Sequence, residues 1–291
     1  DLTIDPTGNL IIKGSTSDNT TAALNVQDSS GNSLLYVRND GNVGIGTNSP
    51  EAPLEIAGRV YQTGLGNSTF FGYQAGANDD LSSNKNTAIG YQSLYSNTTG
   101  YENIAVGPYA LYSNTDGFLN IALGERALYL NTGGYRNTAL GYKALYSNTT
   151  ANFNVAVGDQ ALYSNTGSFN VALGVSALYS NVSGIHNVAL GSSTLYYLDS
   201  GSNNTAIGDQ AGHGISGQSS FQNGVMIGYK AGYGLTTGSN NLLLGYQAGD
   251  NLTTGSNNII IGYNIDAPTA DTSDFLSIGN LIFATGGFGT G

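Results

Sequence analysis

The sequence has no cysteine and no tryptophan, and only 9% of its 291 residues are charged. Without cysteine the chain has no disulfide, no thiolate metal site and no thiol nucleophile. No apolar run comes near the roughly 18 residues that a membrane-crossing helix needs, so we expect no membrane insertion. The 19 acidic residues outnumber the 8 basic ones, and the formal net charge of −11 disfavours nucleic acid as a partner.

Groups that perform catalysis are also scarce. The two histidines, His186 and His213, fall in different columns of the repeat described below. The string "GHGISG" at 212–217 matches a dinucleotide-binding glycine pattern, but no strand–helix–strand unit surrounds it. No serine stands in a nucleophile phrase such as GxSxG, and Asp79 and Asp80 are neighbours that a strand would send to opposite faces. We expect no enzyme, no cofactor and no metal site; a glycosidase that pairs carboxylates from distant coils is the remaining enzymatic alternative.

What the chain has in abundance is glycine, 43 residues, together with a phrase that repeats. The phrase has the form Asn-x-Ala-(Ile/Leu/Val)-Gly, and we take its final glycine as the anchor of each copy. Most anchors lie 17 residues apart, with single intervals of 16, 18 and 20. The anchors are Gly72, Gly90, Gly107, Gly124, Gly141, Gly158, Gly174, Gly191, Gly208, Gly228, Gly245, Gly262 and Gly279.

A period this short, rich in glycine and β-branched residues, predicts an all-β fold built as a parallel β-roll or β-solenoid. A helical repeat would need two or more turns of helix per unit and rarely carries so much glycine. The pattern assigns residues 63–291 to a β-roll repeat domain of about 12 coils. It assigns residues 1–62 to a β-rich stalk or shaft module.

Positions counted from the anchor glycine show which side chains face inward. Position −2 is mostly alanine, and position +4 is leucine in most of those coils. Where −2 is large, +4 becomes glycine, which is expected of two facing positions in a close-packed core. The exchanged pairs are Phe70 with Gly76, Met226 with Gly232, and Leu243 with Gly249, and the exception is Ala206 with Gly212. We infer that −2 and +4 meet inside each coil, across a thin roll of two strands.

Positions −3 and −1 then point out of the roll, and most of them are aliphatic. A strand that is apolar on both faces needs cover on both faces. One interpretation is a second core inside a thicker monomeric solenoid. The other is an oligomer seam along the whole rod, because so long a stripe exceeds what soluble monomers expose. The predicted seam residues are Ile89, Val106, Leu123, Leu140, Val157, Leu173, Leu190 and Ile207.

The phrases "NTAIG", "NIAVG", "NVAVG" and "NVALG" resemble the head repeats of trimeric autotransporter adhesins. The resemblance covers roughly residues 67–280. It implies a left-handed parallel β-roll that associates as a homotrimer, with the aliphatic face on the trimer axis. The coils here are longer than the usual head repeat, and "ALYSNT" stands in place of its Ser/Ala half.

The first sixty residues or so follow a different pattern, with turn signals at 5–9, 28–32 and 39–42. Between these turns we expect short strands in hairpins too small to stand alone. The expected strands are 10–12, 23–26, 34–37, 43–45 and 54–56. The segment "YVRNDGNVGIGTNSPEAPLEIAG" at 36–58 resembles β-modules of phage tail fibres, which often precede a C-terminal self-cleaving chaperone domain. The final "LSIGNLIFATGGFGTG" is a candidate for the place where such a domain was removed.

Two further columns repeat along the coils. Position +5 is mostly tyrosine, and in register these rings would stack about 4.8 Å apart. Exposed rings with hydroxyls suit sugars or apolar ligand patches; alternatively the stack only stabilises the roll. The candidate ligand-binding residues are Tyr95, Tyr112, Tyr129, Tyr146, Tyr163, Tyr179, Tyr196 and His213. Position −4 is mostly asparagine, which we interpret as a structural ladder.

These observations predict a rigid trimeric fibre segment, part of a phage tail fibre or a bacterial cell-surface adhesin, located on the virion or outside the cell. Its partners would be its own copies and a cell-surface glycan or protein receptor. The three extra residues of coil 208–228 are the expected specificity loop. A purely structural spacer without a ligand is one alternative. An ice-binding solenoid is the other, because position +8 is often threonine: Thr98, Thr115, Thr132, Thr149, Thr166, Thr236 and Thr253.

Overall fold

The computed structural model describes residues 2–4, 10–12, 22–38, 41–56, 67–80, 82, 84–279 and 281–285. The chain divides into two compact units, Asp1–Thr63 and Gly64–Gly291. The boundary expected between residues 62 and 63 falls within 57–66, outside the described residues. Across the described ranges the regular structure is β-strand, which confirms the all-β class. No helix in those ranges has the length and apolarity that crossing a bilayer requires.

The first unit contains short strands only. They are β1 (Leu2–Ile4), β2 (Leu10–Ile12), β3 (Ala22–Gln27), β4 (Ser33–Arg38), β5 (Val43–Ile45) and β6 (Leu54–Ile56). β1 and β2 form an antiparallel hairpin, and β3 to β6 form a second sheet. The sequence predicted all of them except β1. The predicted hairpins hold from β3 to β5, but β5 and β6 pair in parallel because residues 46–53 return the chain to the starting end of β5.

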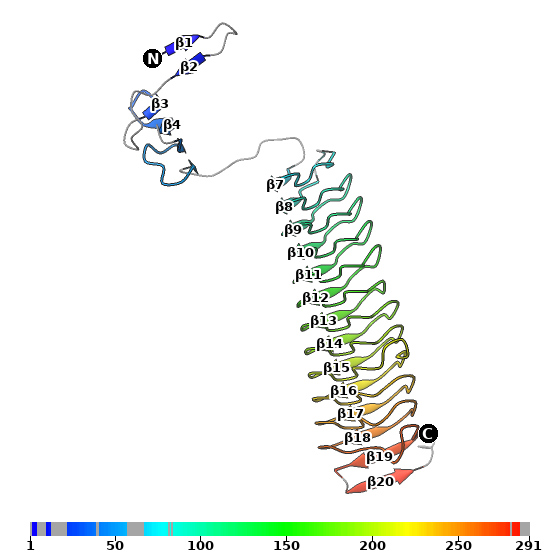
Figure 1. Cartoon of the computed structure of the whole chain (residues 1–291). Helices are drawn as coiled ribbons and strands as arrows, with labels where there is room; N and C mark the ends of the chain where they lie inside the picture. The colour runs from blue at the N-terminus through cyan, green and yellow to red at the C-terminus, as the bar shows by residue number, and fades with distance from the viewer. Residues whose placement is uncertain are drawn as a thin grey trace. The chain divides into compact units, whose positions relative to one another are not determined.

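The second unit is a stack of coils, each of which contributes one strand to a 14-stranded sheet. Strands β7 to β19 are parallel and in register, so equivalent residues of successive coils pair directly, as Ala122 does with Ala139. Figure 1 shows these strands one above another. The predicted parallel β-solenoid is therefore confirmed. The strands are β7 (Thr69–Phe71), β8 (Thr87–Ile89), β9 (Ile104–Val106), β10 (Ile121–Leu123), β11 (Thr138–Leu140), β12 (Val155–Val157), β13 (Val171–Leu173), β14 (Val188–Leu190), β15 (Thr205–Ile207), β16 (Val225–Ile227), β17 (Leu242–Leu244), β18 (Ile259–Ile261), β19 (Phe275–Ile278) and β20 (Ile282–Thr285).

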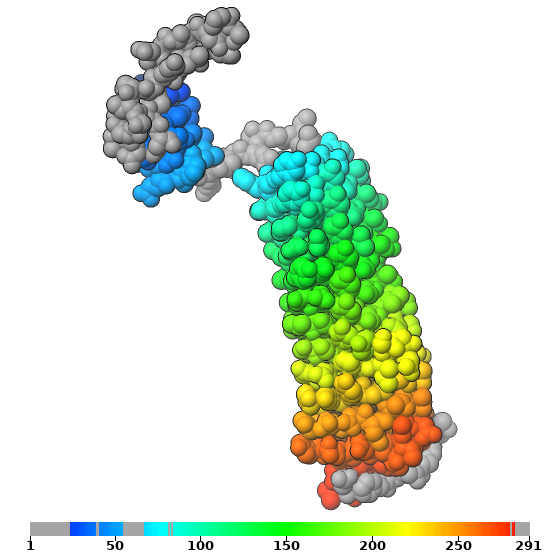
Figure 2. Space-filling view, in the orientation of Figure 1, coloured from blue at the N-terminus to red at the C-terminus, as the bar shows by residue number. Residues whose placement is uncertain are grey.

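The last strand closes the C-terminal end of this sheet. β20 pairs with β19 in the antiparallel sense, with Ser277 opposite Phe283. An exposed strand edge offers unpaired N–H and C=O groups to other chains, and the hairpin occupies the edge of β19. Figure 2 shows the coils of the second unit as one continuous body from β7 to this end.

The two facing positions predicted from the sequence fill the inside of each coil. Ala105 at −2 and Leu111 at +4 are fully buried in one apolar core that runs through the stack. The structure also confirms the exchange of volume between −2 and +4, in which a large −2 side chain faces a glycine at +4. A Cβ added to Gly76 would lie 2.5 Å from the ring of Phe70, so glycine leaves the room that this ring occupies.

At the exception, Gly212, side chains from other positions fill the space inside the coil. A Cβ there would lie 2.8 Å from Leu195 Cδ2 and 2.8 Å from Met226 Cε, which belong to the preceding and following coils. Phe221, from the irregular coil itself, is fully buried and lies 3.5 Å from the same point. Neighbouring residues therefore supply the volume that Ala206 and Gly212 lack.

The predicted second strand of each coil is wrong. In the described coils the strand covers positions −3 to −1, with −4 added in β19, and the segment from +3 to +8 is a run of turns and bends with a single isolated β-bridge. The backbone explains this, because φ is positive at +2 and +4, being 57° at Arg126 and 51° at Leu128. Such a left-handed residue interrupts extended backbone at a cost of about 1–2 kcal/mol. Burial of Leu128 and the 2.9 Å hydrogen bond from its N–H to Ala144 O in the next coil offset that cost.

The anchor glycine is required for two reasons. At Gly124 φ is +134°, a backbone conformation that L side chains rarely adopt. A Cβ added there would also lie 2.5 Å from Gly141 O, the backbone of the next coil. The repeat of glycine at this column therefore follows from how closely the coils stack.

Candidate functional site

The aliphatic face consists of the −1 side chains of β8 to β15 and of the aliphatic −3 side chains beside them, since −3 is threonine in β8, β11 and β15, and it is open to solvent. Ile89 is 42% exposed and Leu173 is 47% exposed, although each lies in a strand that pairs on both sides. No described segment of the second unit covers this face, which contradicts the alternative of a second core within the chain. The remaining seam residues differ in degree. Leu123 and Ile207 are exposed, and Val106, Leu140, Val157 and Leu190 are half-buried.

The tyrosine ladder is the +5 column, on the far side of the coil from the strand. Its members are Tyr95, Tyr112, Tyr129, Tyr146, Tyr163, Tyr179, Tyr196, His213 and Tyr233. Successive ring centroids lie 4.8 to 5.4 Å apart, with interplanar angles of 4° to 16°. All the rings are half-buried. Because each ring covers the faces of its neighbours, only ring edges and hydroxyls are available to a ligand.

Cationic side chains lie beside this ladder. Lys143 Nζ is 5.8 Å from the ring centroid of Tyr146, and Lys230 Nζ is 5.1 Å from that of Tyr233. Arg126 Cζ lies 5.6 Å from the ring centroid of Tyr109, which itself meets two rings of the ladder edge-on. Such cation–π contacts are worth about 0.5–1 kcal/mol at exposed sites. The cations are therefore held next to the aromatic column.

The surroundings favour the protonated hydroxyl at two positions of the ladder. Burial, together with the neighbouring tyrosines, raises the pKa of Tyr129 and of Tyr196. A hydrogen bond with Tyr142 raises the pKa of Lys143, so its ammonium group stays charged. At neutral pH this surface therefore presents hydrogen-bond donors and positive charge.

The sequence analysis missed a second aromatic stack at the corner that leads into the strand. It consists of Tyr101, Phe118, Tyr135, Phe153, Phe169 and His186. The first three rings stand at position −6 and the last three at −5, and Tyr135 meets Phe153 edge-on at 5.4 Å. No single column of the repeat contains all six rings. The signal was present in the sequence but shifted by one position midway.

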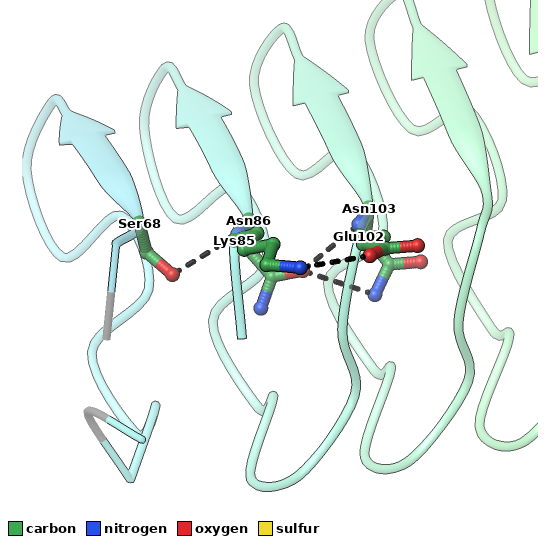
Figure 3. A network of polar contacts seen from close by, with 5 residues as sticks. All are labelled: Ser68, Lys85, Asn86, Glu102 and Asn103. Carbon is green, nitrogen blue, oxygen red and sulfur yellow. Dashed lines mark hydrogen bonds and ion pairs between the residues drawn. The ribbon is translucent and has the colours of Figure 1, made fainter. Parts of the chain in front are cut away.

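The asparagine column at −4 forms a buried ladder, as predicted. Asn103 donates from its backbone N–H and from Nδ2 to Asn86 Oδ1, at 2.9 and 3.2 Å, as Figure 3 shows. A second asparagine ladder at +7 was not predicted; its members are Asn97, Asn114, Asn131, Asn148, Asn165 and Asn181. The pattern was readable, since "YSNT" carries this asparagine in four coils and "YLNT" and "YSNV" carry it in one each.

Both asparagine ladders start at one carboxylate. Asp79 Oδ2 accepts from Asn86 Nδ2 and Asn97 Nδ2, each at 3.1 Å, and Asp79 Oδ1 accepts from Asn84 Nδ2. Asp79 occupies position +7 of the first coil, the place of the asparagine in later coils. Its carboxylate is therefore committed to structure. Both of its oxygens accept hydrogen bonds from asparagine side chains within the coils, so Asp79 does not face a surface where a glycosidase would place its general acid or base.

The other candidate groups for chemistry are also separated. His213 belongs to the tyrosine ladder, where burial lowers its pKa, and His186 belongs to the second aromatic stack. Burial and a hydrogen bond to Asp266 raise the pKa of Asp250, which stands at +5 after the last ring of the ladder. Among the described residues no three His, Asp or Glu side chains converge to hold a metal ion.

The threonine column uses its hydroxyls within the stack. Thr98 Oγ1 donates to Thr115 O at 3.1 Å, and Thr132 Oγ1 donates to Thr149 O at 3.2 Å. The same contact to the next coil recurs from Thr236 to Thr253 O. These hydroxyl protons are therefore directed at backbone rather than at an ice lattice. That geometry gives the ice-binding alternative no support.

The irregular coil between Gly208 and Gly228 places its extra residues on the surface. Residues 215–218 are exposed, whereas Phe221 is fully buried. Ser219 Oγ accepts from Ile215 N at 2.8 Å and donates to Leu235 O at 3.0 Å, which fixes the base of the loop to the next coil. The loop lies next to His213 in sequence and so adjoins the tyrosine ladder.

No protein-family model matches the sequence, and neither a curated protein nor a solved structure is significantly similar to it. These comparisons therefore add nothing to the resemblance to adhesin heads or to tail-fibre modules. The repetitive β-solenoid that the resemblance implies is present in the structure.

Proposed function

We propose that this protein is a rigid segment of an extracellular fibre, assembled as a parallel homotrimer through its aliphatic face. The observation that carries the proposal is the uninterrupted column of exposed and half-exposed aliphatic side chains along β8 to β15. Apolar patches of this extent on soluble proteins mark association surfaces. A second copy of the same rod matches it best, because parallel rods present the same aliphatic residue at every step.

The fibre projects a receptor-binding surface from a phage tail or a bacterial cell. With the aliphatic face turned to the trimer axis, the tyrosine ladder lies on the outside of each rod. The exposed loop at 215–218 adjoins it and gives one coil a surface that the others lack. A cell-surface glycan or protein is the class of receptor that such an outer surface would meet.

Measurement of the native mass by light scattering tests the assembly. We expect three times the chain mass of 30.0 kDa for the wild type. Leu123→Asp places a carboxylate on the aliphatic face and should abolish the trimer, because an unpaired charge buried at a seam is costly. Tyr129→Ala, on the far side of the coil, should leave the trimer intact. A wild-type chain that is monomeric, or a folded Leu123→Asp variant with the same mass as the wild type, would overturn the proposal.

A further inference from the structure

We propose that the tyrosine ladder binds an extended acidic polysaccharide that lies along the stack, with Arg126 and Lys143 contacting its carboxylates. This inference rests on the proposed function, since it names the ligand class of the surface that the fibre displays. It is carried by two independent features of the ladder: the geometry of its hydroxyls, and the sign of the charges around it.

The first feature is a periodic row of hydrogen-bond donors. The rings repeat every 5.2 Å from Tyr95 to Tyr146, with interplanar angles of 10° or less. This spacing is close to the advance per sugar unit of an extended polysaccharide chain. Parallel rings hold their hydroxyls at the same spacing, so successive sugars meet successive donors. A phenol hydroxyl can donate to sugar and carboxylate oxygens, and burial raises the pKa of Tyr129.

The second feature is the charge of the +2 column beside the ladder, although acidic residues also lie close by: Glu125 contacts Arg126, and the charge of Asp209 acts on His213. The chain carries a net charge of −11, yet the +2 column that borders the ladder contains cations and neutral residues only. That column is Gln74, Gln92, Tyr109, Arg126, Lys143, Gln160, Ser176, Ser193, Gln210, Lys230, Gln247 and Asn264. From Tyr95 to Tyr233 the ladder itself has no acidic member. Glu125, Asp159 and Asp209 stand at +1 instead.

Arg126 and Lys143 are equivalent residues of consecutive coils, so their charges are one step apart along the same row. Arg126 contacts Glu125 at 3.6 Å and leaves 38% of its side chain exposed, which keeps guanidinium donors available to a ligand. Guanidinium and ammonium groups bind carboxylates through charge-assisted hydrogen bonds. Two such groups next to a row of hydroxyls match a polymer that carries both hydroxyl and carboxylate groups.

The same geometry disfavours the other common polyanion, nucleic acid. Single-stranded nucleic acids bind by stacking bases on aromatic faces, and here the faces are covered by neighbouring rings. A polyuronate can bind through ring edges and hydroxyls alone, without access to the ring faces.

Binding of matched polymers to the full chain tests the proposal. The probes are polygalacturonate, alginate and hyaluronate, with fully methyl-esterified polygalacturonate as the neutral counterpart and single-stranded DNA as the competing polyanion. Titration calorimetry at low and high salt gives the affinities. The variant Arg126→Gln/Lys143→Gln removes the two charges at the ladder. The control Lys85→Gln/Arg136→Gln removes two charges at position −5, the corner on the other side of the coil.

We expect the wild type to bind at least one of the acidic polysaccharides, more weakly as salt rises, and to prefer polygalacturonate to its ester. The ladder variant should bind roughly tenfold more weakly, and the control variant should match the wild type. Absence of binding to all three acidic polymers, equal affinity for acid and ester, an equal loss in both variants, or tighter binding of DNA would each overturn the inference. The native mass of the same samples reports separately on the trimer, so failure of the inference and failure of the proposed function are distinguishable.

Discussion

Asn131 shows how a single residue type secures the interior of the coils. Its Nδ2 donates to Asn114 Oδ1 at 2.7 Å and to Gly134 O at 3.0 Å, and its Oδ1 accepts from Asn148 Nδ2 at 2.9 Å. This buried side chain therefore bonds to the preceding coil through Nδ2 and to the following coil through Oδ1. Because a buried amide left unpaired is costly, the ladder fixes the register of successive coils.

Replacement of Asn131 by leucine should destabilise the fold by about 1–3 kcal/mol, because Asn114 Oδ1 would lose its donor while buried. Asn181→Leu is the matched control. Asn181 Oδ1 already has no partner, since Leu198 occupies the next position of this ladder. Asn165 Oδ1 would keep the amide of Asn170, so this variant should be close to neutral. Urea unfolding of both variants checks the prediction, and an equal loss of stability would contradict it.

His213 predicts a dependence of stability on pH. Burial lowers its pKa below the usual 6.5, so the folded chain favours the neutral ring. The unfolded chain takes up a proton near pH 6.5 that the folded chain resists, and this contribution to stability is therefore complete above pH 6.5 and lost as the pH falls. His213→Tyr restores the ring type of its column and should lose less stability between pH 7 and pH 5 than the wild type. Urea midpoints at pH 7 and pH 5 measure this loss. An identical change in midpoint for the variant and the wild type would refute the role of His213.

At the scale of the element, each coil is one short strand joined to a chain of turns. The strand supplies the alanine at −2, and a left-handed residue at +4 turns a leucine inward to meet it. In the Leu243 coil the same space is filled from the opposite side, and a Cβ on Gly249 would lie 2.9 Å from Leu243 Cδ2. The coil therefore tolerates either arrangement, provided that the summed volume is kept.

Transfer of that exchange to another coil is a direct test. Leu128→Gly alone should cost about 2–5 kcal/mol through the cavity, and Ala122→Leu alone about 1–3 kcal/mol through overpacking. The free energy of unfolding lost in the double variant should be at least about 1 kcal/mol smaller than the sum of the losses in the two single variants, because the new leucine fills the cavity. Ala122→Leu combined with Leu178→Gly, three coils away, should be additive. Equal additivity in both pairs would mean that −2 and +4 are not coupled.

At the scale of the whole molecule, the second unit is quasi-one-dimensional, since each coil contacts chiefly its neighbours. Stability then accumulates coil by coil, and a surface feature that recurs in successive coils forms a stripe. The aliphatic face and the tyrosine ladder are two such stripes on different walls. In the proposed trimer, this separation leaves the tyrosine ladder outside the interface formed by the aliphatic face.

The absence of cysteine from the natural sequence allows a clean cross-linking test of the seam. In a trimer with the aliphatic face on its axis, Leu123→Cys places three thiols close together. Mild oxidation should then give disulfide-linked dimers on a non-reducing gel. Thr132→Cys, at an exposed position of the same coil away from the strand, should remain monomeric. Equal cross-linking of the two variants would indicate random collision instead of a defined seam.

Much of the coil could be predicted from the sequence alone: its 17-residue period, the buried columns at −2 and +4, the structural asparagine ladder at −4, and the glycine at the anchor. These features are predictable because the same steric demand recurs in every copy, so one column of residues records it many times. The first unit was less predictable, as the missed strand β1 and the parallel pairing of β6 show, because each of its contacts occurs once.

Only the tertiary structure decided how the coil closes and what it displays. The positive φ of Leu128 turned an expected second strand into turns, and leucine carries no sequence signal for that conformation. The second aromatic stack passes from Tyr135 at −6 to Phe153 at −5, so no single column of the repeat records it, and the folded coils define the contact between the two columns. The ring faces of the tyrosine ladder are covered by the rings above and below. Hydrogen-bond partners, ring orientation and exposure depend on the neighbouring coil, and a residue's own position in the repeat does not specify them.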